Sequence, residues 1–77
     1  MPKIIPINYQ KLVKIFQIEG FAVNRIKGDH LIMVKMSNKR PLVIKMRPTK
    51  VPVTHIKTNL HTAGISRKRY FELLEKV

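Results

Sequence analysis

The sequence contains no cysteine and no tryptophan, and its apolar residues form only short runs. The absence of cysteine excludes disulfide bridges, thiol catalysis and cysteine-ligated zinc. A membrane-spanning helix needs about 20 apolar residues in a row, and the first residues lack the apolar stretch of a secretory signal. With 77 residues, the chain has room for a single core. We therefore expect one soluble, cytoplasmic domain that spans residues 1–77.

Acidic residues are also scarce. Four Asp and Glu stand against 16 Lys and Arg, which gives a formal net charge of +12 and a sequence pI of about 10.7. Between Phe21 and Phe71, Asp29 is the single acid. Such an excess of cations predicts an anionic partner. The cations are spread over strand-like segments and loops instead of following one face of an amphipathic helix, which favours nucleic acid over a membrane surface.

The first half of the chain predicts a helix followed by three strands. Apolar residues at helical spacing follow Asn8, which can cap the helix, and Gly20 supplies its stop. Two strand-length segments then flank Gly28-Asp29, which is typical of a β-hairpin. The expected strands are residues 21–27, 31–36 and 41–46, with a second turn over residues 37–40.

The second half predicts two helices. Ile56, Leu60 and Ala63 recur at helical spacing, with Thr54 or Thr58 as the cap and Gly64 as the stop. Ser66 is a good cap for a last helix, in which Tyr70, Leu73, Leu74 and Val77 form one apolar stripe. The sequence therefore predicts an α+β fold of α-β-β-β-α-α order, with a three-stranded antiparallel sheet that carries helices on one face and leaves the other face open.

Most enzyme classes lack their motifs in this chain. There is no phosphate-binding loop, no dinucleotide glycine pattern and no helical His-Glu pair for zinc. The four carboxylates are scattered along the sequence, which argues against an acid–base pair and against a two-metal nuclease site. We therefore expect no metal ion and no small-molecule cofactor, and histidine chemistry in a basic environment remains.

His30 is the strongest candidate for that chemistry. It follows Gly28-Asp29 at the mouth of the hairpin, on the same strand face as Ile32 and Val34, where we expect a half-buried ring. A histidine can remove the proton of an RNA 2′-hydroxyl so that this oxygen attacks the neighbouring phosphorus. Nearby cations can stabilise the charge that develops on the phosphate. The alternative is that His30 only caps the turn.

The other candidates serve binding. Arg67, Lys68 and Arg69 fall in the first turn of the last helix, where the helix dipole favours anions and disfavours cations, so a phosphate or an acidic protein is expected there. His55 and His61 are expected on the second helix, without a catalytic role. The aromatic residues fall mostly at core positions, so an exposed stacking platform is not expected. The predicted RNA- or antitoxin-binding set is Arg25, Lys27, Lys35, Lys45, Arg67, Lys68 and Arg69.

Several of these segments, in this order, resemble one known family. The chain has Glu19-Gly20-Phe21 after the first helix, Lys27-Gly28-Asp29-His30 at the hairpin, and Ala63-Gly64-Ile65-Ser66 before the last helix. This combination is similar to the HicA toxins of HicA/HicB toxin–antitoxin pairs, and the resemblance extends from about Asn8 to Leu74.

The resemblance implies a double-stranded-RNA-binding-domain-like fold and a metal-independent endoribonuclease that cleaves single-stranded mRNA. It makes His30 the catalytic residue and Gly28 the backbone element that presents it, and it implies an acidic HicB-type antitoxin as partner. The family more often has Ser where this chain has Asp29, and a carboxylate there is consistent with either tuned or weakened activity. The family often has Pro-x-His before the penultimate helix, whereas Pro52 and His55 are one residue further apart, so His55 is not carried over.

Two other functions fit the same residues. One is a non-catalytic RNA-binding module that recognises phosphate and shape on the same basic face. The other is an interaction protein whose cations serve only a permanent acidic partner. RNA contacts would weaken steeply with salt, which separates the first of these from the second.

Overall fold

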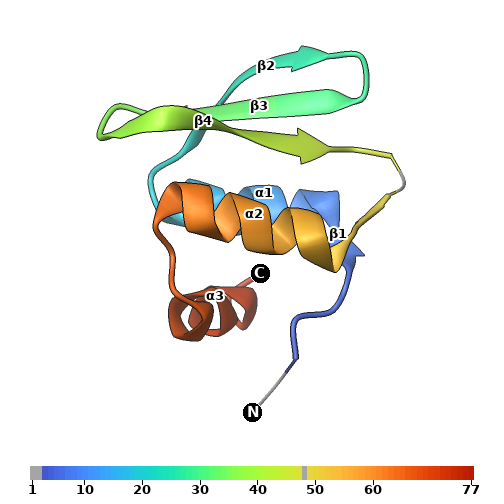
Figure 1. The fold of residues 1–77 in the computed structure, drawn as a ribbon, viewed down its shortest axis with the longest axis vertical. Helices are drawn as coiled ribbons and strands as arrows, with labels where there is room; N and C mark the ends of the chain where they lie inside the picture. Colours follow the sequence, from blue (N-terminus) through green and yellow to red (C-terminus); the bar gives the residue numbers. More distant parts are fainter. Residues whose placement is uncertain (1–2, 48) are drawn as a thin grey trace.

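The structure is a computed structural model that describes residues 3–47 and 49–77. It is an α+β fold in which helices cover one face of a three-stranded antiparallel sheet, as predicted (Figure 1). This arrangement is compatible with the fold that the resemblance implies. The elements are β1 (Ile7–Asn8), α1 (Tyr9–Ile18), β2 (Ala22–Lys27), β3 (His30–Lys35), β4 (Asn38–Lys45), β5 (Lys50–Val51), α2 (Val53–Ala63) and α3 (Arg67–Leu74).

Helix α1 begins and ends where the sequence predicts. The Asn8 side chain accepts a hydrogen bond of 2.8 Å from the backbone N–H of Gln10, which satisfies one of the free donors at the helix start. After the helix, Gly20 has a φ of 98°, and the next amide, of Phe21, donates to the carbonyl of Phe16. This sharp exit turns the chain directly into the sheet.

The sheet has the order β2-β3-β4, but the second turn is shorter than predicted. Lys35 pairs with Asn38, so the turn consists of Met36 and Ser37, and β4 begins at Asn38 and not at Pro41. The pairing of β3 with β4 is irregular between Met33 and Lys35, opposite the stretch that contains Pro41. Since β4 is an edge strand, a proline within it is tolerated there.

Two features of the second half differ from the sequence prediction. Strands β1 and β5, which were not predicted, pair antiparallel through Ile7 with Val51, and the amide of Tyr9 donates to the carbonyl of Thr49. Helix α2 begins after Pro52 without a side-chain cap, so the capping role expected for Thr54 or Thr58 was wrong. Thr58 instead donates its hydroxyl to the Thr54 carbonyl within the helix.

The end of α2 and the start of α3 agree with prediction. Gly64 adopts a left-handed conformation with a φ of 72° after α2. Ser66 caps α3 by accepting from the amide of Arg69 at 3.1 Å. Val77 lies beyond the end of α3, although it still packs against the core.

The core lies between the sheet and the helices. In Figure 1, α1 and α2 lie beneath the sheet, and α3 lies beyond them on the side away from it. Alternate residues of β3 and β4 enter this layer, and the helices contribute one stripe each. None of the described helices is both long and apolar enough to cross a membrane. The fully buried side chains of largest volume are Tyr70, Phe16, Leu12, Ile15, Met33, Leu42, Ile44, Ile56, Leu73 and Val51.

Tyr70 supplies a test of this packing. Its side chain is fully buried, and its hydroxyl has no hydrogen-bond partner among the described residues. A buried hydroxyl without a partner costs about 1–3 kcal/mol. We predict that Tyr70→Phe raises the free energy of unfolding at pH 7 by about 1 kcal/mol, as measured by urea denaturation. A loss of stability would mean that the hydroxyl is hydrogen-bonded.

Burial also raises the pKa of Tyr70. The native state then holds this proton more tightly than the unfolded chain does, so the contribution is present below the unfolded pKa of about 10 and is lost as pH rises through the native pKa. We expect the wild-type chain to lose more stability than Tyr70→Phe between pH 9 and about pH 11. Equal losses of stability in the two chains would contradict this role of Tyr70. Because both chains carry the same lysines, the comparison cancels the effect of lysine deprotonation on stability.

Candidate nucleic-acid interface and catalytic histidine

A two-residue turn presents His30. Lys27 pairs with His30, and Gly28 and Asp29 form the turn between them. Gly28 has a φ of 61°, a value that non-glycine residues adopt only at a cost. The amide of Met46 donates to the Asp29 carbonyl at 2.7 Å, which ties the turn to the end of β4. The backbone around His30 is therefore held from both sides.

Asp29 holds the imidazole of His30. The Nδ1 atom of His30 lies 2.9 Å from Oδ1 of Asp29, and the two side chains are 50% and 36% exposed. The ring is thus half-buried, as expected from the sequence. A neutral imidazole that donates from Nδ1 leaves Nε2 as a proton acceptor. The carboxylate next to His30 therefore suits a role in orienting the ring.

The register of the sheet places cations on both sides of His30. Lys27 of β2 and Lys45 of β4 are its direct cross-strand partners. Directly paired residues share one face of a sheet, with Cβ atoms about 5 Å apart. Lys27, His30 and Lys45 therefore form a row across all three strands, which we call the basic row.

The basic row lies on the open face of the sheet. Its neighbours Leu31 and Ile44 are buried against the helices, so alternation turns His30 and Lys45 to the opposite side. The next row on the open face is Arg25, Ile32 and Val43, in which Val43 is exposed. An anionic polymer that lies across the strands would meet Arg25, the basic row and the imidazole together.

Other predicted binding residues lie elsewhere. The ammonium of Lys35 is 5.5 Å from the centre of the Phe21 ring, at the junction of α1 and β2, and not beside His30. Arg67 lies over the ring of Phe71 at 5.8 Å on α3, and Lys68 is exposed on the same helix. In Figure 1, α3 is separated from the sheet by α1 and α2. The structure therefore divides the predicted set into two surfaces.

Arg69 makes contacts within the chain. Its Nε donates to Oε1 of Glu19 at 2.8 Å, and Nη1 lies 3.4 Å from Oε1 of Glu72. The hydrogen bond that Arg69 donates to Glu19 is the main cause that raises the pKa of Arg69. This pair joins the end of α1 to the start of α3 and gives the cation an internal acidic neighbour at the helix terminus.

The other two histidines and the aromatic residues lie away from the open face of the sheet or in the core. His55 and His61 are exposed on α2, as predicted, and α2 packs on the covered side of the sheet. Phe16, Phe21 and Tyr70 are buried, whereas Tyr9 and Phe71 are partly buried against the core. Across residues 3–47 and 49–77, no three His, Cys, Asp or Glu side chains gather in a way that could hold a metal ion.

Sequence reasoning missed a groove beside the hairpin turn. It has a volume of about 760 Å³ and brings together residues from three stretches of the chain. Arg47 adds a cation here, and its position directly after the third predicted strand, residues 41–46, was the one signal in the sequence that could have indicated it. The lining residues are Tyr9, Gly28, Asp29, Met46, Arg47 and Thr49.

Gly28 allows a test of the backbone conformation of the turn before His30. A Cβ atom at this position would meet nothing within 4 Å, so only the backbone conformation opposes a side chain. We predict that Gly28→Ala lowers the free energy of unfolding by about 1–2 kcal/mol, measured by urea denaturation. A synthetic chain with D-alanine at position 28 should retain the wild-type stability, because a positive φ is natural for that residue. Equal destabilisation by both alanines would point to a steric cause.

No protein-family model matches this chain, and a search of curated proteins gives no match. The resemblance to the HicA toxins therefore rests on the residues quoted in the sequence analysis.

Proposed function

We propose that this protein is a metal-independent endoribonuclease, the toxin of a toxin–antitoxin pair, which cleaves single-stranded mRNA with His30. The observation that carries the proposal is the basic row: a half-exposed histidine, held through Nδ1 by Asp29, between Lys27 and Lys45 on the open face of the sheet. The resemblance to the HicA toxins supports the same assignment.

The chemistry follows from the orientation of the ring. Nε2 of His30 accepts the proton of a 2′-hydroxyl, and the 2′-oxygen forms a bond to the adjacent phosphorus. The bond from phosphorus to the 5′-oxygen of the next nucleotide breaks, and this oxygen takes a proton from water. The products are a 2′,3′-cyclic phosphate and a free 5′-hydroxyl. Lys27 and Lys45 stabilise the additional negative charge on the phosphate oxygens.

His30→Ala is the direct test of this function. We expect the rate of cleavage of a single-stranded RNA, measured with purified protein in the presence of a chelator, to fall by about 10²–10⁴. His61→Ala is the matched control, because His61 is exposed on α2, and it should cleave at the wild-type rate. A 2′-deoxy nucleotide at the cleaved position should block the reaction in all chains.

The outcomes separate the candidate functions. Full activity of His30→Ala would remove the catalytic assignment. RNA binding by both chains without cleavage by either would leave a non-catalytic RNA-binding module. In cells without the antitoxin, growth arrest with loss of mRNA is expected for the wild-type chain and not for His30→Ala.

The basic row also predicts a salt dependence. For single strands, each neutralised phosphate contributes a slope of about −0.7 to the dependence of log K on log salt. In a His30→Ala background, Lys27→Gln with Lys45→Gln should therefore make the slope shallower by about 1.4, measured by fluorescence anisotropy. Lys35→Gln should leave the slope unchanged, because its ammonium lies at Phe21. Equal changes in slope for Lys35→Gln and for Lys27→Gln with Lys45→Gln would show that these lysines contribute through their charge alone, whatever their position.

A further inference from the structure

Strand β2 is exposed along its whole length. All six of its residues are exposed, and it lies at the edge of the sheet, paired only with β3 among the described residues. The main contacts of α1 and α2 with the sheet are made to β4. In Figure 1 the sheet lies above the helices, and the hairpin of β2 and β3 forms one edge of it. The backbone groups on the outer edge of β2 are therefore open to another strand.

The side of β2 that faces the helices is apolar. Ile26 pairs with Leu31 and Val23 pairs with Met33, and both partners are buried core residues. Paired residues share a face, so Ile26 and Val23 point to the helix side of the sheet. They are nevertheless 59% and 42% exposed, because the helical layer does not reach beneath them. Two apolar side chains are thus left without cover next to the core.

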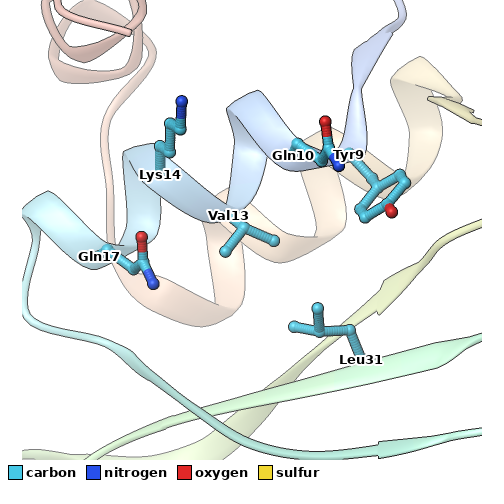
Figure 2. A pocket seen from close by; sticks show the side chains of 6 residues that line it. All are labelled: Tyr9, Gln10, Val13, Lys14, Gln17 and Leu31. Carbon is cyan, nitrogen blue, oxygen red and sulfur yellow. The ribbon is translucent and has the colours of Figure 1, made fainter.

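A groove adjoins this surface. It lies between α1 and β3, has a volume of about 420 Å³, and is lined by Tyr9, Gln10, Val13, Lys14, Gln17 and Leu31. Figure 2 shows Val13 and Tyr9 projecting from α1 on the side of Leu31, while Lys14 projects away from it. Because Leu31 is the cross-strand partner of Ile26, the apolar surface continues from the groove to the free edge of β2.

The surroundings of the groove are cationic. Lys14 lies at its rim, and Arg25 and Lys27 alternate with Ile26 along β2. Asp29, the nearest acid in sequence, lies 2.9 Å from His30 beyond the end of β2. Two copies of the chain joined through β2 would bring Arg25 and Lys27 of each copy together, which opposes self-association. An acidic partner would meet complementary charge on the same strand.

An irregularity in β2 limits where another strand can pair with it. The pairing with β3 shifts between Val23 and Arg25, so Asn24 is an extra residue in the strand. Such a bulge twists an edge and hinders long, regular pairing with another sheet. Residues 25–27 continue in regular register up to the hairpin, which leaves a short stretch on which a strand can add.

We propose that an acidic protein segment in extended conformation binds here as an added strand on the free edge of β2. Its apolar side chains occupy the groove against Val13 and Leu31 and cover Ile26, and its carboxylates pair with Lys14, Arg25 and Lys27. This is strand addition, in which main-chain hydrogen bonds give affinity and alternate side chains give specificity. The apolar contacts of this site lie on the face of β2 opposite His30, whereas Arg25 and Lys27 lie on the same face as His30. The inference does not depend on RNA cleavage.

The first experiment uses a synthetic twelve-residue peptide in which glutamate alternates with valine or isoleucine. Its affinity for the full chain is measured by fluorescence anisotropy. We expect Ile26→Lys to weaken binding at least tenfold, because it places a charge in the apolar contact. Met36→Lys is the matched control, since Met36 is also an exposed apolar residue but lies in the turn between β3 and β4, and it should bind as the wild type does. Equal binding by all three chains would overturn the proposal, because attraction to net charge would then suffice.

A second measurement tests the main-chain contact. N-methylation of alternate peptide residues removes the amides on one edge of the bound strand and keeps every side chain. One of the two alternate patterns should abolish binding, and the other should preserve most of it. In the complex with the peptide, the hydrogen exchange of the β2 backbone amides should slow. Without the peptide, the Ile26→Lys chain should cleave RNA in a His30-dependent reaction at the wild-type rate. Equal tolerance of both methylation patterns would exclude strand addition.

The other possible occupants give distinct results. A concentration-dependent dimer in sedimentation that Ile26→Lys abolishes would replace the acidic segment by a second copy of the chain. Chemical-shift changes at Val13 and Ile26 on addition of a single-stranded oligonucleotide would assign the groove to RNA. Either result would overturn the proposal, and neither bears on whether His30 catalyses cleavage.

Discussion

Burial of Leu31 and Met33 in the central strand fixes the geometry of the whole sheet. Both side chains pack against the helices, so the register of β3 against its two neighbours has one solution that keeps the core intact. A shift by one residue would send His30 into the apolar layer and expose Leu31. The position of the histidine on the open face is thus a result of core packing, and the two lysines beside it are placed by the same register.

The same constraint gives β2 two different faces. Lys27 and Arg25 share the open side with His30, whereas Ile26 lies on the side of the helices. The sheet is wider than the helical layer that covers it, so Ile26 remains exposed although it adjoins the core. A small domain with one sheet and short helices can therefore present a polar surface for an anionic polymer and an apolar edge for a protein on one strand.

The sequence predicted those parts of the fold that have strong local signals. The caps at Asn8 and Ser66, the stops at Gly20 and Gly64, and the hairpin at Gly28-Asp29 depend on residues within one turn of each other. Strands β1 and β5 are two residues each, too short for any periodicity, and form only because distant segments meet. The start of β4 was placed too late because Pro41 suggests a strand beginning, although an edge strand accepts it inside.

The candidate site was predictable only in part. His30 and the turn before it follow from the order of residues, but Lys45 reaches the histidine through pairing of strands that are separated by a turn. The separation of Lys35 from His30 also needed the structure, because its long side chain bends towards Phe21. A list of cations in the sequence does not distinguish one surface from another, since cross-strand register decides which of them act together.

Three of the four acidic side chains of this chain are already engaged with neighbouring residues. Glu19 and Glu72 face Arg69, and Asp29 faces His30, while the chain carries 16 Lys and Arg. Folding therefore gathers like charges into a small volume with little internal compensation, and self-repulsion opposes the compact state. Dissolved salt screens that repulsion, but it also competes for contacts with any anionic polymer. Ionic strength thus acts in opposite directions on this molecule, strengthening the folded state while loosening its hold on a charged ligand.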